Sequence, residues 1–250
     1  MMKTGFVLAA ATVITLMTGC NNLSHKTMIS EGKPMKIVCL GDSITGQPNL
    51  KSYLKWSFVL ECMCEARMGE GNVIVLNRGI GGDTSGGALQ RLQGDVLDEK
   101  PDIVIILLGG NDAGAKKNRA EVKSNLETIV RKCKAIEAKV LMLQYHVIPN
   151  PEHPETAWAH LDDNNDLIAE VATAESVPVL DLAQPMQDAF KSSKVSELLS
   201  YKNGVAVWET KPVLQEHLVS SKDGVHLNPG GELVFARTIF KKLQSLGWLQ

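Results

Sequence analysis

Four short segments of the chain carry residue types that could perform nucleophilic chemistry. They are Gly41-Asp42-Ser43, the glycine-rich loop from Gly79 to Gly87, Gly109-Gly110-Asn111-Asp112 and Asp223-Gly224-Val225-His226. A serine hydroxyl is a good nucleophile only when a base within hydrogen-bond reach removes its proton, and histidine suits that role near neutral pH. Glycine backbone and an asparagine amide can stabilise the oxyanion that forms when serine attacks a carbonyl. Together these residue types predict an acyl-transfer site with Ser43 as the nucleophile.

The hydrophobic pattern indicates which elements hold these segments in place. Apolar runs of strand length lack clean alternation, which is typical of strands covered on both faces, and helical stretches separate them. The expected strands are residues 35–40, 73–76, 103–108, 139–144 and 177–181, and the expected helices are residues 51–68, 86–98, 118–137, 157–175 and 229–246. A strand-then-helix repeat predicts a three-layer α/β/α sandwich around a doubly wound, five-stranded parallel sheet.

This arrangement places the four segments at one edge of the sheet. The first three directly follow the first three expected strands, and the fourth precedes the last expected helix. In doubly wound folds, ligands bind where the loops at the carboxyl ends of the strands converge. We therefore expect the four segments to form one site.

In this order the segments resemble the sequence blocks of the SGNH hydrolases, also called the GDSL esterase and lipase superfamily. The second block is matched by Gly81-Gly82-Asp83-Thr84, and the resemblance covers roughly residues 35–245. It implies a flavodoxin-like fold and a serine esterase that works through an acyl-enzyme. By this resemblance Ser43 is the nucleophile, His226 its base and Asp223 the carboxylate that orients the histidine. The oxyanion donors it implies are the backbone N–H groups of Ser43 and Gly82 and the side-chain amide of Asn111.

Three aspartates in these segments are interpreted differently. We expect Asp42, Asp83 and Asp112 to hydrogen-bond loop backbone and hold the shape of the site without taking part in the chemistry.

Each segment alone also has a simpler interpretation. Gly-Asp-Ser after a strand can be an ordinary turn, and Asp223 with His226 can be a helix N-cap and a surface histidine. Phosphate binding is disfavoured, because Gln47-Pro48 stands where a P-loop needs Lys and Ser or Thr, and the loop at Gly79 lacks the third glycine of a dinucleotide fingerprint. From another class of protein, a non-catalytic glycan-binding lipoprotein of the same fold is the alternative. The complete set of site residues argues against it.

The first residues are expected to direct export. Lys3 precedes an apolar run from Phe6 to Met17, which predicts a signal peptide over residues 1–19 and is too short for a membrane-spanning helix. Met17-Thr18-Gly19-Cys20 resembles the lipobox of bacterial lipoproteins, which implies lipidation of Cys20. Residues 20–34 then form a polar tether, and residues 35–250 form the hydrolase domain. We expect a lipid-anchored protein of the bacterial cell envelope, periplasmic or on the cell surface, that contacts the membrane through the anchor only.

Composition and the remaining polar residues limit the possible partners. A net charge of −2 without a long basic run argues against nucleic acid. Cysteines at 39, 62, 64 and 133 show no disulfide framework and are interpreted as small core residues, with the environment of Cys133 left open. The spacing of His146, His153, His160 and the nearby Asp162, Asp163 and Asp166 fits no metal-ligand pattern, so neither a metal nor a cofactor is expected. His146 either lines the substrate pocket or is a structural histidine.

Two classes of ester are compatible with this site. Removal of O-acetyl groups from carbohydrate is favoured, because exported members of the family that the chain resembles deacetylate glycans. Lysophospholipase or thioesterase activity on lipid acyl esters is the alternative. The long connection over residues 183–222 leads into Asp223 and is either a lid that selects the substrate or packing for the helix beneath it. The sequence makes no prediction of oligomeric state.

Overall fold

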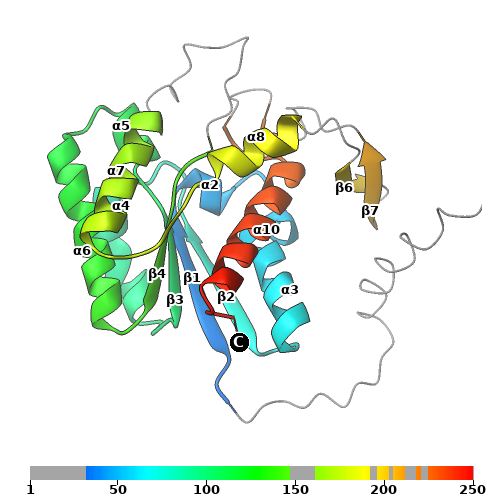
Figure 1. Cartoon of the computed structure of the whole chain (residues 1–250), viewed down its shortest axis with the longest axis horizontal. Helices are drawn as coiled ribbons and strands as arrows, with labels where there is room; N and C mark the ends of the chain where they lie inside the picture. The colour runs from blue at the N-terminus through cyan, green and yellow to red at the C-terminus, as the bar shows by residue number, and fades with distance from the viewer. Residues whose placement is uncertain are drawn as a thin grey trace, which may run out of the picture. The chain divides into compact units, whose positions relative to one another are not determined.

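The computed structural model describes residues 32–146, 161–191, 196–202, 205–211, 218–220 and 225–249, with backbone alone for Phe190 and for 196–202 and 205–211. Its centre is a parallel five-stranded sheet in the order β2-β1-β3-β4-β5 (Figure 1). The strands are β1 (Met35–Gly41), β2 (Val73–Gly79), β3 (Ile103–Leu107), β4 (Lys139–Leu143) and β5 (Val179–Leu180). All the elements described below belong to one compact unit that begins at Lys33.

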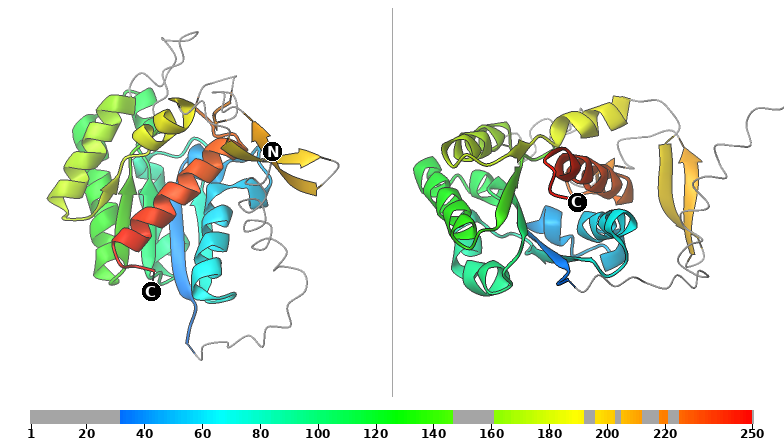
Figure 2. Two further views of the ribbon diagram at one scale, coloured as in Figure 1. Left: turned by 45° about the vertical axis from the view of Figure 1, so that its right-hand side comes forward. Right: turned by 60° about the horizontal axis from the view of Figure 1, so that its bottom comes forward.

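Helices cover both faces of the sheet, as the views in Figures 1 and 2 show. On one face lie α3 (Trp56–Met68) and α10 (Pro229–Ser245), and on the other lie α4 (Ser85–Leu92), α6 (Arg119–Ala135) and α7 (Leu161–Ala174). Every residue of β3 is buried, which explains why its sequence is a continuous apolar run. The predicted three-layer, doubly wound α/β fold is confirmed.

The register of the central strands brings their carboxyl ends together. Gly41 at the end of β1 pairs with Gly79 of β2 on one side and with Leu107 of β3 on the other. The loops that follow these three strands therefore leave the sheet at the same level. Close backbone packing also requires glycine here, because a Cβ on Gly79 would lie 2.2 Å from the backbone nitrogen of Gly46.

Several short elements escape the sequence prediction. Residues 52–54 form a 3₁₀ turn, η2 (Ser52–Leu54), and α3 begins only at Trp56, whereas a helix was predicted from residue 51. The predicted helix over 86–98 is α4 followed by a turn of π-helix, η3 (Gln93–Leu97). Helices α2 (Ser43–Gly46) and α5 (Gly110–Gly114) span a single turn each, which is too short to show a helical period in the sequence.

The connection over 183–222 contains more structure than its sequence indicates. It holds helix α8 (Ala183–Lys191) and an antiparallel hairpin of β6 (Ser196–Lys202) and β7 (Val205–Lys211). Whether this region acts as a lid stays a prediction. None of the described helices is long and apolar enough to cross a membrane.

One cysteine differs from the expectation of a core residue. Cys39, Cys64 and Cys133 are buried free thiols, but Cys62 is exposed. Cys62 and Cys64 are two residues apart on α3, and a helix turns by about 100° per residue, so the two side chains face nearly opposite directions. Only Cys64 can face the sheet.

Candidate active site

The candidate nucleophile stands at the first turn of α2. Strand β1 ends at Gly41, and the side chain of Asp42 caps the helix by accepting a hydrogen bond from the backbone N–H of Ile44 at 2.9 Å. Ser43 is the first helical residue and is 9% exposed. The strand therefore delivers Ser43 to the edge of the sheet, and the cap fixes the direction in which its hydroxyl points.

The candidate base lies against this serine. The Nε2 atom of His226 is 2.9 Å from the Oγ atom of Ser43, a distance at which a proton can be transferred. The loop of His226 is held by the backbone N–H of Ser220, which donates to the carbonyl of His226 at 2.7 Å, and by a bridge between Val219 and Leu227. The structure thus brings together two residues that 183 positions separate in sequence. Asp223, the predicted third member, lies outside the described residues.

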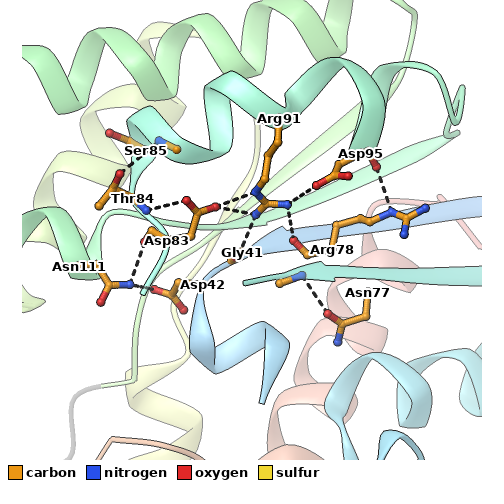
Figure 3. A network of polar contacts seen from close by, with 12 residues as sticks. Gly41, Asp42, Asn77, Arg78, Asp83, Thr84, Ser85, Arg91, Asp95 and Asn111 are labelled. Carbon is orange, nitrogen blue, oxygen red and sulfur yellow. Dashed lines mark hydrogen bonds and ion pairs between the residues drawn. The ribbon is translucent and has the colours of Figure 1, made fainter. Parts of the chain in front are cut away.

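The loops that carry Gly82 and Asn111, two of the predicted oxyanion donors, contact the residues just before Ser43: Ile80 donates to the carbonyl of Gly41 at 3.0 Å, and Asn111 reaches Asp42. The side-chain amide of Asn111 donates to the backbone carbonyl of Asp83 at 2.8 Å, and this contact orients the amide (Figure 3). The same amide nitrogen lies 3.5 Å from a carboxylate oxygen of Asp42. Gly82 has φ of +76°, a left-handed conformation that glycine adopts without strain. Within the described part of the chain, the backbone N–H groups of Ser43 and Gly82 donate to no protein acceptor. Both can therefore donate to a substrate.

Asp42 belongs to a buried hydrogen-bonded group that the sequence analysis did not detect. The hydroxyl of Tyr145 donates to a carboxylate oxygen of Asp42 at 2.6 Å, and the same hydroxyl accepts from the backbone N–H of Gly110 at 3.1 Å. Burial raises the pKa of the Asp42 carboxyl from 3.8 to about 6, against the hydrogen bonds from Tyr145 and Ile44, which lower it. Tyr145 follows β4 and belongs to no motif. The only signal that the sequence offers for its contact with Asp42 is a tyrosine hydroxyl near the end of a strand.

A second undetected residue, Arg91 of α4, ties the glycine loop to the end of β1. Its guanidinium donates to the Asp83 carboxylate at 2.8 Å and to the backbone carbonyls of Gly41 at 3.2 Å and Arg78 at 2.9 Å (Figure 3). It also pairs with Asp95 at 2.6 Å. A planar guanidinium suits this task, because it offers several N–H donors in fixed directions. Arg91 thereby fixes the loop that carries Gly82 relative to the strand that carries Ser43.

All three supporting aspartates accept hydrogen bonds from backbone N–H groups, of Ile44 in α2, of Thr84 before α4 and of Ser85 at the start of α4. Asp42 accepts from Ile44 and Asp83 from Thr84, both at 2.9 Å. Asp112 is buried and accepts from the backbone N–H of Ser85 at 2.7 Å and from its hydroxyl at 2.9 Å. This last contact joins the loops that follow β2 and β3.

Ionisation of Asp42 should make stability depend on pH. The folded carboxyl binds its proton more tightly than the unfolded chain does, so the free energy of unfolding falls as the pH rises from about 4 through about 6. One pKa unit corresponds to about 1.4 kcal/mol, so the ionised carboxyl costs about 3 kcal/mol at neutral pH. In urea titrations we measure the unfolding free energy of Asp42→Asn minus that of wild type. We expect this difference to rise by about 2 to 3 kcal/mol between pH 4 and pH 7.

The comparison with Asp42→Asn isolates this one carboxyl. Glu232 is also buried, and burial raises the pKa of its carboxyl well above the ordinary range, but it is present in both proteins and cancels in the difference. A difference that stays flat across this pH range would contradict the shifted pKa of Asp42.

Those of the histidines and aspartates considered as a metal site that the structure describes do not lie together. His146 is buried three residues beyond the end of β4, where its Nε2 atom lies 2.7 Å from the backbone carbonyl of Val225. Asp162, Asp163 and Asp166 are exposed on α7, and His153 and His160 lie outside the described residues. Among the residues that the structure describes, no three metal-ligating side chains lie close enough to hold an ion.

A serine and a histidine in contact, with amide donors beside them at the carboxyl edge of a parallel sheet, define the class of α/β serine hydrolases. The model of the GDSL-like lipase/acylhydrolase family matches residues 39–232. The chain belongs to this family, whose members include carboxylic ester hydrolases.

Individual relatives place the chain more closely within the family. It is 34% identical to the esterase TesA of Pseudomonas aeruginosa over 136 residues, which are 54% of this chain and 65% of that esterase. It is 40% identical to the uncharacterized lipoprotein YqeF of Bacillus subtilis over 79 residues, and these residues are 31% of this chain and 32% of that protein. The matches thus span less than two thirds of these curated relatives. The crystal structure of a lipase/acylhydrolase from Enterococcus faecalis aligns with a TM-score of 0.63 and 27% identity, and covers 85% of this chain and 96% of that one.

Proposed function

We propose that the protein is a serine esterase that hydrolyses carboxylic esters through an acyl-enzyme. The contact of 2.9 Å between the Ser43 hydroxyl and Nε2 of His226 carries this proposal. His226 takes the hydroxyl proton as Ser43 attacks the carbonyl carbon, and the N–H groups of Ser43 and Gly82 with the Asn111 amide hold the oxyanion. Collapse of the tetrahedral intermediate breaks the ester bond, and His226 gives its proton to the departing alcohol. In the second half of the reaction His226 takes a proton from a water molecule, which attacks the acyl carbon. The bond to Ser43 Oγ then breaks, the acid leaves, and His226 returns the proton to Ser43.

Asp223 completes the triad in this proposal. A carboxylate that accepts from the other imidazole nitrogen keeps the correct tautomer and stabilises the imidazolium. Its position three residues before His226 supports this role. The carboxylate of Asp42 interacts electrostatically with His226 and is therefore a second negative charge, beside that of Asp223, that acts on this histidine.

For the substrate, we propose O-acetyl groups on carbohydrate. The glycine loop beside the nucleophile supports a polar alcohol. Gly81 and Gly82 are exposed, and no atom lies within 4 Å of where their Cβ atoms would stand. The Asn111 amide donates to the carbonyl of the following residue, Asp83. Backbone N–H groups and an amide in an open loop suit a ligand rich in hydroxyl groups.

A lipid acyl ester is the second candidate. Ile80 is 48% exposed in the same loop and would present an apolar surface to an acyl chain. The similar structure from Enterococcus faecalis, at 27% identity, is described as a lipase/acylhydrolase, which supports this substrate class as well.

We further propose that the chain is exported and anchored in the envelope through a lipid on Cys20, with residues 1–19 as the signal peptide and 35–250 as the hydrolase domain. Cys20 lies outside the described residues. The similarity to the lipoprotein YqeF supports an envelope location.

A panel of esters tests both the activity and the substrate. The full chain and its Ser43→Ala variant are assayed on p-nitrophenyl acetate, butyrate and octanoate, and then on acetylated xylan and a lysophospholipid. Turnover that favours acetate, releases acetate from xylan and is lost in Ser43→Ala would support the proposal. A preference for octanoate and lysophospholipid would transfer support to the lipid candidate, and turnover equal to that of Ser43→Ala on all substrates would refute the esterase.

A further inference from the structure

Two consecutive side chains just beyond β4 reach the loops of the candidate site. Tyr145 and His146 are 0% and 2% exposed. Successive side chains of an extended segment point to opposite sides of the chain, so the two can contact different loops. Neither residue belongs to a motif of the sequence analysis, and the mechanism above assigns neither a chemical step.

Helix α7 holds the backbone of Tyr145. Strand β5 ends at Leu180, which pairs with Leu143 and accepts a hydrogen bond from the backbone N–H of Gln144 at 2.9 Å, so Tyr145 lies beyond the end of that neighbouring strand. Asn165 of α7 takes the place of a strand partner. Its amide oxygen accepts from the N–H of Tyr145 at 2.6 Å, and its amide nitrogen donates to the carbonyl of Tyr145 at 2.9 Å. The backbone of Tyr145 is therefore held on both its N–H and its carbonyl, as that of a strand residue is.

Tyr145 joins the first and third loops. Its hydroxyl donates to Asp42 at 2.6 Å and accepts from the N–H of Gly110 at 3.1 Å. Both are buried contacts, and the tyrosine ring lies so close to Gly110 that a Cβ there would stand 3.0 Å from a ring carbon. One hydroxyl group thereby sets the distance between the loop of Ser43 and the loop of Asn111.

His146 holds the last loop. Its Nε2 atom lies 2.7 Å from the carbonyl oxygen of Val225, and because a carbonyl can only accept, Nε2 carries the proton and donates. The ring also packs edge-on against Phe235 of α10, with ring centroids 5.1 Å apart. Val225 is thus held by a side-chain hydrogen bond, and the next residue is His226.

The three anchored groups share a simple relation to the proposed chemistry. Each anchored residue directly precedes a residue of the site: Asp42 precedes Ser43, Gly110 precedes Asn111, and Val225 precedes His226. We propose that Tyr145 and His146 are a positioning pair that sets the relative placement of nucleophile, oxyanion donor and base. This inference rests on the proposed esterase function.

The expected effect lies on catalysis more than on binding. Both side chains are buried and contact the loops, so their loss should misalign the reacting atoms while leaving the exposed binding surface in place. Misplacement of reacting groups by about 1 Å can cost about 100-fold in rate. A merely structural role would instead reduce the amount of folded enzyme and leave the rate per folded site unchanged.

Three variants separate these cases. Tyr145→Phe removes only the hydroxyl. His146→Gln keeps an N–H donor near the position of Nε2, and His146→Met has a side chain of similar length without a donor. With p-nitrophenyl acetate, we expect Tyr145→Phe and His146→Met to lower kcat by about 10- to 100-fold with KM changed by less than about threefold. His146→Gln should retain most of the wild-type kcat.

Active sites are counted with a p-nitrophenyl alkylphosphonate. Ser43 Oγ forms a bond to phosphorus, p-nitrophenolate leaves, and His226 takes the hydroxyl proton, so the burst gives the number of competent sites and its rate reports their alignment. The rate of this reaction should fall in Tyr145→Phe and His146→Met in parallel with kcat per site. Wild-type kcat per site in both Tyr145→Phe and His146→Met would overturn the inference and leave the esterase standing. Equal losses of kcat in His146→Gln and His146→Met would overturn the positioning role of His146, because the first keeps an N–H donor and the second does not. Absence of wild-type turnover would refute the esterase and the inference with it.

Discussion

Ser43→Ala should lower kcat for ester hydrolysis by on the order of 10⁵-fold. The variant loses the Oγ atom that forms the acyl-enzyme and that lies 2.9 Å from Nε2 of His226. The remaining rate would come from the oxyanion donors and substrate binding alone, which act only on direct attack by water. Steady-state turnover of p-nitrophenyl acetate by purified enzyme measures the loss.

A matched control excludes a general effect of losing a serine. Ser124 is exposed on α6, and Ser124→Ala should keep wild-type kcat. The fold should survive Ser43→Ala, because the Asp42 cap of α2 accepts from Ile44 and not from Ser43. Circular dichroism and the thermal midpoint check this point. A folded Ser43→Ala enzyme with wild-type turnover would remove Ser43 from the mechanism.

His226→Ala should lower kcat by a similar factor, on the order of 10⁵-fold. Without the imidazole, the Ser43 proton has no acceptor at 2.9 Å, and the departing alcohol has no donor. The effect should fall on kcat with little change in KM, because the base acts in the transition state and not in binding.

Added imidazole gives this prediction its specific test. His226 is only partly buried, so truncation to alanine opens a space that a free imidazole can enter from solvent. Millimolar imidazole should restore part of the activity of His226→Ala and none of the activity of Ser43→Ala. If imidazole had the same effect on both variants, the restored rate would be hydrolysis in solution, and the base would have to be sought elsewhere.

The sheet and the candidate reacting residues could be found from the sequence because each leaves a local signal. A strand buried on both faces requires a continuous apolar run such as Ile103–Leu107. A serine nucleophile, a histidine base and an amide donor are chemically required types, and the loops after parallel strands are where such groups meet. These signals are enough to assign Ser43 and His226 to one site.

The residues that hold the site left no such signal. Tyr145 reaches Asp42 across 103 positions, His146 reaches Val225 across 79, and Arg91 reaches Gly41 across 50. No spacing within one element indicates these pairs, because the contacts exist only once different strand ends lie side by side. The same holds for Cys62, whose exposure depends on which face of α3 meets the sheet.

The sequence by itself thus determined the fold class and the chemical groups of the candidate site, because hydrophobic periodicity and reactive residue types are local properties of the chain. The tertiary structure alone decided which buried hydroxyl, imidazole and guanidinium hold those groups at reacting distance. A buried polar side chain must find a partner wherever the packing puts one, and that partner is set by the arrangement of the strands in space and not by the order of residues along the chain.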